Sequence, residues 1–139
     1  MIPAIAIVQA WQAAANDQNI DRLLALSAPD IVIIGPRGRG SGHGLLREWI
    51  ARAGLTLSTQ RVFQRDDTVV LAQHGTWQST ATSGVASEAD LASRFRVRDQ
   101  RVIEFERYED LASALTAAAM SEADEQPRSA QTAKPQSLQ

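Results

Sequence analysis

The stretch from residue 89 to residue 107 decides the fold, and it reads ADLASRFRVRDQRVIEFER. Its first ten residues alternate between two sets of side chains, as the two faces of a half-buried strand do. Asp99 and Gln100 then form a tight turn into a second strand, Arg101 to Arg107, which must pair antiparallel with the first. We expect one face of the first strand to carry Leu91, Ser93, Phe95 and Val97, and the opposite face to carry Asp90, Ala92, Arg94, Arg96 and Arg98.

Further strands and helices surround this hairpin. Strand patterns occupy residues 31–34, 55–64 and 69–80, and helical patterns occupy residues 4–15, 20–24, 45–50 and 109–119. Loops rich in glycine or small polar residues separate them at 37–42 and 81–87. Consecutive strands joined by short turns imply an antiparallel sheet, and segregated helices imply the α+β class.

Composition limits the kind of protein that this chain can be. Its 139 residues are 44% hydrophobic and 22% charged, which suits one globular domain. The absence of cysteine excludes disulfides, thiolate nucleophiles and cysteine-ligated metals. A net charge of −2 predicts no nucleic-acid partner, and no apolar run is long enough to predict a membrane span. The apolar N-terminus lacks a basic leader, so we interpret it as the first helix and predict a cytoplasmic protein.

The end of the chain differs from the rest. Residues 121–139 contain two prolines, many Ser, Ala and Gln, and no aromatic residue. Such a segment buries too little apolar area to offset the entropy lost on ordering. We therefore predict a folded domain over residues 1–120 and a disordered C-terminal tail over residues 121–139.

A series of short motifs matches the order and spacing found in one superfamily. The matching pieces lie at residues 8–11 (VQAW), 16–21 (NDQNID), 35–36 (GP), 42–49 (GHGLLREW), 95–102 (FRVRDQRV) and 106–111 (ERYEDL). Over roughly residues 4–115 the chain thereby resembles the nuclear transport factor 2-like superfamily, also called the polyketide-cyclase-like or ketosteroid-isomerase-like fold.

This resemblance implies an architecture but no single function. It implies a curved antiparallel sheet that forms a cone, three to four helices that close an internal hydrophobic pocket, and often a homodimer built on the outer face of the sheet. The fold hosts isomerases, dehydratases, cyclases, epoxide hydrolases and non-catalytic binders, so function has to be argued from the site.

Three chemistries of this fold can be tested on individual residues. Ketosteroid isomerases need a carboxylate base, which the resemblance places at Gly35, while Trp11 and Ser93 stand at the oxyanion-donor positions. Proton abstraction by that mechanism is therefore not expected. The epoxide-hydrolase pattern falls on Gln73, Gly75 and Asp110, where one carboxylate of two remains. A dehydratase needs inward-facing histidines, but alternation along the strand places His74 on the outward face.

Six residues form the candidate site. The resemblance places four polar or aromatic side chains on the concave face with Trp11, as ligand contacts of the pocket; these are Gln73, Trp77, Ser93 and Tyr108. The alternative is a filled core in which the same side chains pack against one another. Asp110 opens the last helix, where a carboxylate caps free N–H groups, and it is also the candidate catalytic acid or base.

Charged residues outside this site have simpler interpretations. Arg94, Arg96 and Arg98 predict an outward basic stripe that pairs with Glu104 and Glu106 or lies in a dimer interface. The glycine- and arginine-rich loop at residues 37–42 is interpreted as a flexible entrance, and the histidine that follows it as a helix cap. The two histidines lack metal-ligand spacing, so no metal and no cofactor are predicted.

We therefore predict a small-molecule-binding pocket protein of this superfamily. As an enzyme it would be a cofactor-independent lyase, isomerase or hydrolase acting on a lipophilic substrate, with Asp110 as acid or base and Trp11 and Tyr108 as oxyanion donors. The alternative is a non-catalytic dimeric interaction module that uses the outer face of the sheet.

Overall fold

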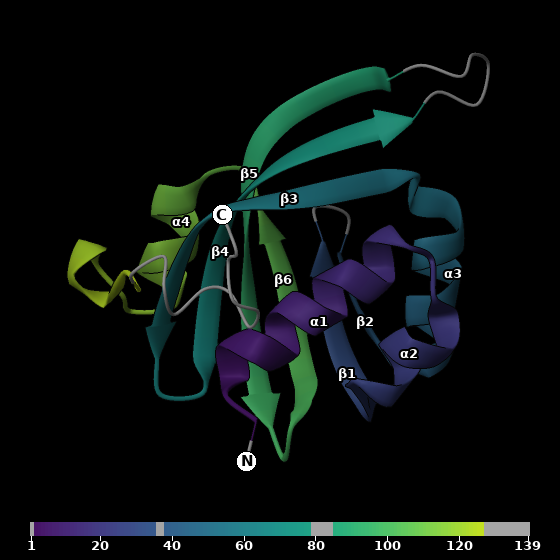
Figure 1. Ribbon diagram of the computed structural model, residues 1–139, viewed down its shortest axis with the longest axis horizontal. Helices are drawn as coiled ribbons and strands as arrows, with labels where there is room; N and C mark the ends of the chain where they lie inside the picture. The colour runs from purple at the N-terminus through teal and green to yellow at the C-terminus, as the bar shows by residue number, and fades with distance from the viewer. Residues whose placement is uncertain (1, 36–37, 79–84, 127–139) are drawn as a thin grey trace, which may run out of the picture.

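The computed structural model describes residues 2–35, 38–78 and 85–126. Within these residues the chain forms four α-helices, one short 3-10 helix and a six-stranded sheet (Figure 1). The α-helices are α1 (Ala4–Asn16), α2 (Ile20–Ala25), α3 (His43–Ala53) and α4 (Leu111–Ala117), and the 3-10 helix η1 (Glu122–Asp124) follows α4. The strands are β1 (Ser27–Gly35), β2 (Gly38–Ser41), β3 (Leu55–Arg65), β4 (Thr68–Gln78), β5 (Val85–Arg98) and β6 (Arg101–Tyr108).

The sheet is mixed, which corrects the expectation of an antiparallel one. Its strand order is β2-β1-β6-β5-β4-β3, and β1 runs parallel to β6. The two end strands, β2 and β3, have no pairing with each other in the described part of the chain, so the sheet is curved but not closed. The predicted loop at residues 37–42 contains strand β2, which pairs antiparallel with β1.

The predicted hairpin is confirmed. Strands β5 and β6 pair antiparallel, and Phe95 lies opposite Phe105. Asp99 and Gln100 both adopt positive φ, which the tight turn between the strands requires. A register shift between Arg96 and Val97 marks a bulge close to this turn.

We call the face of the sheet that carries α1 the inner face and the opposite one the outer face. Helix α1 crosses the inner face and contacts β3, β4, β5 and β6 (Figure 1). The alternation predicted for β5 is confirmed, because Phe95 is fully buried on the inner face and Arg94 lies on the outer face. The inner core joins residues of α1, α2, α3 and the strands; its largest members are Trp11, Phe95, Phe105, Leu23, Ile31 and Leu46.

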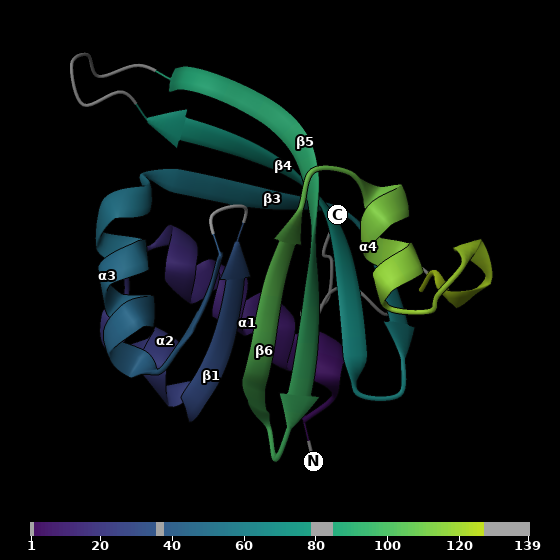
Figure 2. The same ribbon diagram turned by 180° about the vertical axis from the view of Figure 1, so that it is seen from behind.

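Helix α4 covers part of the outer face instead of closing the inner one. Figure 2 shows it against β4, β5 and β6, on the side of the sheet away from α1. A second hydrophobic cluster lies beneath it, formed by Phe63, Val70, Ala92, Ala114, Leu115 and Met120. The sheet is therefore buried on both faces in this region, each face by a different helix.

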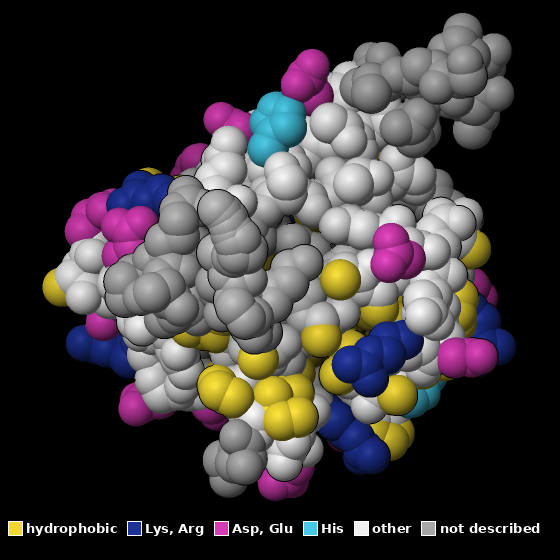
Figure 3. Space-filling view, viewed as in Figure 1, with side chains coloured by type: hydrophobic (Ala, Val, Ile, Leu, Met, Phe, Trp, Pro, Cys, Tyr) yellow, Lys and Arg dark blue, Asp and Glu magenta, His cyan; other side chains and the backbone are white. Residues whose placement is uncertain are grey.

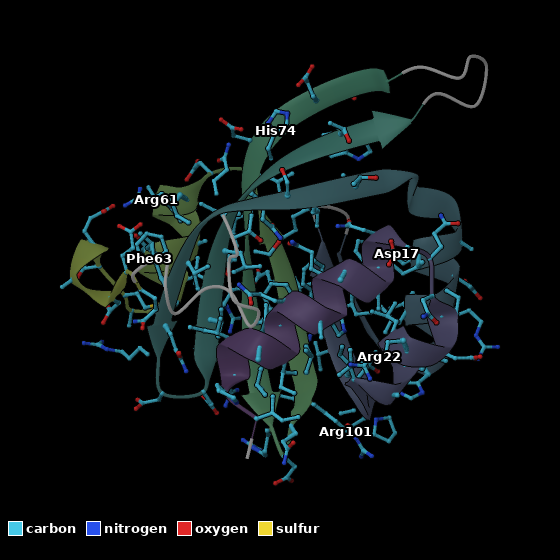
Figure 4. All side chains as sticks on the ribbon, in the orientation of Figure 1. Asp17, Arg22, Arg61, Phe63, His74 and Arg101 are labelled. Carbon is cyan, nitrogen blue, oxygen red and sulfur yellow. The ribbon has the colours of Figure 1, made fainter. Side chains whose placement is uncertain are left out.

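The folded part of the chain continues beyond residue 120. Ser121 caps η1 in a capping box with Asp124. Arg61 of β3 donates to Glu122 and to both carboxylate oxygens of Glu125, at 2.8 and 3.0 Å for the latter (Arg61 is labelled in Figure 4). The N–H of Gln126 donates to the carbonyl of Val62 at 2.8 Å. Charge pairing and strand hydrogen bonds thus hold residues 121–126 against β3, while the domain boundary at residue 120 and the disordered tail stay predictions. Residues 127–139 lie outside the described part of the chain.

The outer cluster predicts a large effect at Phe63, which is 0% exposed (labelled in Figure 4). Phe63→Ala removes a ring that packs under α4 and should lower the free energy of unfolding by about 3–5 kcal/mol. Urea unfolding monitored by circular dichroism measures the change. Thr56→Ala, on the same strand and face but exposed, is the matched control, with an expected change within about 0.5 kcal/mol. Equal, small changes in both variants would contradict the existence of this second core.

Candidate functional site

An aromatic cluster fills one end of the inner face. The ring of Trp11 lies 5.4 Å from that of Phe95 and 5.1 Å from that of Phe105, centroid to centroid. Trp49 of α3 lies 5.5 Å from Phe105 and closes the cluster from the side of β1. We call these four rings the aromatic layer. Because they pack against one another, this end of the predicted pocket is solid core.

A row of hydrogen-bonded polar side chains lies next to the aromatic layer. The Ser93 hydroxyl donates to Gln73 Oε1 at 2.7 Å, and Gln73 Nε2 donates to Gln12 Oε1 at 2.6 Å. Gln12 Nε2 then donates to the hydroxyl of Thr59 at 2.9 Å. Ser93 and Gln73 are both 0% exposed. We call this row the polar layer; its hydrogen bonds join helix α1 to three neighbouring strands.

Arg107 and Trp77 lie beyond the polar layer. Arg107 is the direct neighbour of Ser93 across the β5–β6 pair, and its guanidinium lies 5.9 Å from the centre of the Trp77 ring. This is a cation–π distance. Both side chains are partly buried. Desolvation by burial lowers the pKa of Arg107, and no carboxylate in the described part of the chain lies within ion-pair distance of it.

Two glycines at this end of the inner face differ in the space around them. A Cβ at Gly75 would lie 3.0 Å from a methyl of Leu91 and 3.2 Å from one of Leu55, so a side chain there would crowd both leucines. A Cβ at Gly35 would meet no described atom within 4 Å. On β1, Gly35 lies two residues after Ile33. On the parallel strand β6, Arg107 lies two residues after Phe105, which is the partner of Ile33. Gly35 therefore lies on the inner face at the same end as Arg107, with open space in front of it.

Trp11 does not provide the free donor expected of it. Its indole Nε1–H donates to the hydroxyl of Ser27 at 2.9 Å, and that hydroxyl donates in turn to the carbonyl of Leu23 at 2.7 Å. The indole is only 1% exposed. Trp11 is therefore a satisfied core residue with no hydrogen left for a ligand.

Tyr108 lies on the wrong face of the sheet for the predicted site. It packs against the outer cluster under α4, and its hydroxyl donates to Glu106 Oε1 at 2.5 Å. Burial, together with this hydrogen bond, raises the pKa of Tyr108. Glu104, Glu106 and Tyr108 follow one another at every second residue of β6, so the outward alternation includes Tyr108. The structure thus brings together Gln73, Ser93 and Trp77, with Trp11 beneath them, and separates Tyr108 from them.

Asp110 caps helix α4, and its carboxylate accepts from the N–H of Ser113 at 2.7 Å. These hydrogen bonds lower its pKa. Because α4 packs on the outer face, Asp110 is not part of the inner site, and its geometry is that of the helix cap rather than of an acid or base.

The two histidines also have structural partners. His74 lies on the outer face, as predicted, between Asp90 and Glu88, with a contact of 2.8 Å to each. In Figure 3 a cyan histidine is flanked by magenta acidic side chains at the top of the molecule; His74 is labelled in Figure 4. The ring of His43 lies 3.1 Å from the carbonyl of Ser27. Within the described residues no group of three or more His, Asp or Glu is placed to hold a metal ion.

Of the three arginines of the predicted basic stripe, Arg94 pairs with the two expected glutamates, whereas Arg96 lies 3.8 Å from Asp67. Arg94 forms ion pairs with Glu104 at 2.8 Å and with Glu106 at 3.0 Å. Burial by itself lowers the pKa of Arg94, but its hydrogen bonds with Tyr108, Glu106 and Glu104 raise it above the ordinary value. Arg94 is therefore paired with neighbouring side chains on the outer face of the sheet.

Sequence reasoning missed Arg107 and Gln12. Arg107 stands two residues after Phe105, so the alternation of β6 already placed it on the inner face. Gln12 follows Trp11 on the first helix, but nothing in the sequence predicted its partner Gln73, 61 positions away.

The fold and the inner face define a class of protein. The architecture is the α+β fold of nuclear transport factor 2-like proteins, and several solved structures of the same fold are described by that name. The family model of the SnoaL-like domain matches residues 8–105, well over half of the chain. The chain belongs to the SnoaL-like domain family. No curated protein matches it significantly.

Solved structures with the same fold belong to proteins of several kinds. TerC co-crystallized with polyporic acid shares 21% identity with a TM-score of 0.69, over 81% of this chain and 95% of that one. A ketosteroid isomerase-like protein from Catenulispora acidiphila, in complex with trimethylamine, shares 22% identity with a TM-score of 0.65, over 87% and 97%. A candidate polyketide cyclase from Sinorhizobium meliloti shares 22% identity with a TM-score of 0.64, over 76% and 94%. At these identities the likeness concerns the fold alone.

The polar layer predicts a cost for removing its central member. Gln73→Leu leaves the buried Ser93 hydroxyl and the Gln12 carbonyl without a partner, so we expect a loss of about 1–3 kcal/mol in the free energy of unfolding. Denaturant titration measures it. Gln64→Leu, on the neighbouring strand β3 with its amide bonded only to an exposed carbonyl, is the matched control and should be close to neutral. Equal effects at both positions would contradict the hydrogen-bonded layer.

The pH dependence of thermal stability tests the role of Asp110 as a helix cap. Its pKa is lower in the folded state than in the unfolded state, so its stabilising contribution is present above pH 4 and is lost as pH falls through the folded-state pKa. Asp110→Ala should lower the melting temperature at neutral pH. Asp110→Asn, which retains the cap, should change it little and should remove this part of the acid dependence. Melting curves between pH 2.5 and pH 7 measure both, and an unchanged acid dependence in Asp110→Asn would contradict the cap.

Proposed function

We propose that the chain binds a small lipophilic molecule at the end of the inner face bounded by Gly35, Ser93, Trp77 and Arg107. We call this the inner-end site. The observation that carries the proposal is the open space at Gly35 beside a partly buried Trp77–Arg107 pair. A site for a small organic molecule needs an apolar wall and a few placed polar groups, and this end of the sheet offers both.

The walls of the inner-end site support a lipophilic ligand. The aromatic layer closes it on one side through Phe105, and leucines of β3 and β5 pack around Gly75 on the other. Between them the polar layer is fully hydrogen-bonded, so its groups fix the shape of the site. Ser93 is itself 0% exposed, so it bounds the site through its hydrogen bond to Gln73 rather than as a contact of the ligand.

The distribution of carboxylates favours binding over proton abstraction. Glu88 and Asp90 of β5 lie on the outer face with His74, and Glu104 and Glu106 of β6 lie there with Arg94. The position at which this fold carries a base, Gly35, has no side chain. A general base must lie within hydrogen-bond reach of the proton it removes, and no described carboxylate on these strands meets that condition.

Two of the similar structures are consistent with a binding role. TerC was crystallized with polyporic acid and the Catenulispora protein with trimethylamine, so members of this fold hold small molecules of different chemistry. No helix in the described part of this chain has the length and apolar character needed to cross a membrane.

The second candidate is the dimeric interaction module. Helix α4 already covers β4, β5 and β6 on the outer face, which leaves the region of Val32 and Ile34 on β1 as the surface that a second copy would use. Homodimer formation therefore stays a prediction; light scattering at micromolar concentration would test it, and a monomer would remove its basis.

Filling the space at Gly35 tests the proposed function. A panel of epoxides, ketosteroids, polyketide intermediates and fatty acids would be screened by thermal shift. A ligand present at one hundred times its Kd stabilises by about 2.7 kcal/mol, which raises the melting temperature by on the order of 10 °C. Gly35→Leu should fold normally, because its side chain enters open space, and should lose the shift.

The matched control is Gly44→Leu. Gly44 is an exposed glycine of α3 that also has no described atom within 4 Å of a Cβ position, so the same side chain is added away from the site. This variant should respond to the ligand as the wild type does. Ligand shifts that persist unchanged in Gly35→Leu would overturn the placement of the inner-end site.

A further inference from the structure

Arg107 differs from the other arginines of the hairpin strands. Arg94 and Arg96 lie on the outer face, where Arg94 is held by two glutamates and Arg96 lies 3.8 Å from Asp67. Arg101, at the other end of β6, is exposed (labelled in Figure 4). Arg107 points to the inner face and is partly buried, and its described partner is the face of the Trp77 ring.

A cation in this position lacks a counter-charge. Guanidinium groups stay protonated in proteins, and arginines are rarely buried without a partner. Burial removes water from Arg107, and the nearest carboxylates of its own strand, Glu104 and Glu106, are taken by Arg94 on the opposite face. The ring of Trp77 offsets part of this cost, but it leaves the edge of the guanidinium, with its N–H donors, free.

We propose that Arg107 is the anion-binding residue of the inner-end site and that its ligand is a flat, conjugated or aromatic monoanion, such as a carboxylate or an acidic enol. This inference rests on the proposed function and specifies its ligand class. The guanidinium edge would donate a fork of two hydrogen bonds to the anionic oxygens. A guanidinium is planar and presents its donors in a fixed fork, which favours a ligand whose anionic group is itself planar.

The surroundings set the charge and the shape of the rest of the ligand. Arg107 is the one cation on the described inner faces of β5 and β6, so it balances a single negative charge. The ligand body would extend from Arg107 across the open space at Gly35, with Phe105 of the aromatic layer below it. A positively charged ligand would be repelled from this site, because no described inner carboxylate of β5 or β6 would balance it.

A pair of probes that differ in charge alone tests the proposal. 2-Naphthoate and 2-naphthamide have the same ring system, and calorimetric or fluorescence titration of the full chain gives both dissociation constants. We expect the naphthoate to bind at least tenfold more tightly than the amide, and this preference to weaken as salt rises. Arg107→Gln should abolish the preference by weakening naphthoate binding tenfold or more while leaving naphthamide binding unchanged.

Two controls separate binding from folding and from net charge. Arg101→Gln makes the same charge change on the same strand at an exposed position and should keep the preference. Arg107→Gln should melt at the same temperature as the wild type or higher, because it removes a desolvated cation. Arg107→Lys, which keeps the charge but not the fork, should retain part of the preference and serves as the second variant if the glutamine variant does not fold.

Each outcome decides the proposal. Loss of the preference in Arg107→Gln but not in Arg101→Gln supports it. Equal binding of the two probes by the wild type, an equal loss in both variants, or no binding of either probe at millimolar concentration overturns the anion site. The proposed function is judged separately, by the loss of neutral-ligand shifts in Gly35→Leu, so failure of the anion site with a positive Gly35→Leu result leaves a site for neutral molecules.

Discussion

Trp11 packs its indole between Phe95 and Phe105, and this contact determines how helix α1 lies on the sheet. The two rings face each other across the β5–β6 pair, so a helix that packs on them is centred over the middle of the sheet. The indole N–H is fixed by Ser27 at the start of β1, which prevents a buried donor from being left unpaired. Gln12 follows Trp11 on the helix and thereby reaches Gln73. The aromatic contact thus positions the polar layer, and the polar layer bounds the inner-end site.

The outer face shows how the remaining sheet surface is protected. Arg94 forms ion pairs with two glutamates on β6, and α4 covers the apolar part formed by Phe63 and Val70. The segment after α4 pairs with the edge strand β3 through Arg61 and the carbonyl of Val62. An unpaired edge invites association with other chains, and here the protein's own C-terminal segment occupies part of it.

Membership of the SnoaL-like domain family defines the fold, and a role has to be argued from the residues on the inner face of this chain. The groups expected to act on a substrate are used elsewhere: Trp11 in the core, Tyr108 on the outer face and Asp110 at a helix cap. Beyond the polar layer, the described inner faces of β4, β5 and β6 present Arg107 and Trp77, and open space lies in front of Gly35 on β1. These features suit recognition of a ligand by charge and shape, and they explain why the proposed role is binding.

The sequence by itself determined most of the elements, though not strand β2, and the faces of the central strands, because side-chain alternation is a local property with a period of two residues. It correctly placed Gln73, Ser93 and Trp77 on one face and His74 on the other, and the same rule applied to β6 would have placed Tyr108 outside and Arg107 inside. Only the tertiary structure decided the parallel pairing of β1 with β6, the position of α4 on the outer face and the order of residues 121–126. Those features depend on contacts between residues far apart in the chain, such as Arg61 with Glu125 and Gln12 with Gln73, and no local pattern encodes which distant partner a side chain will meet.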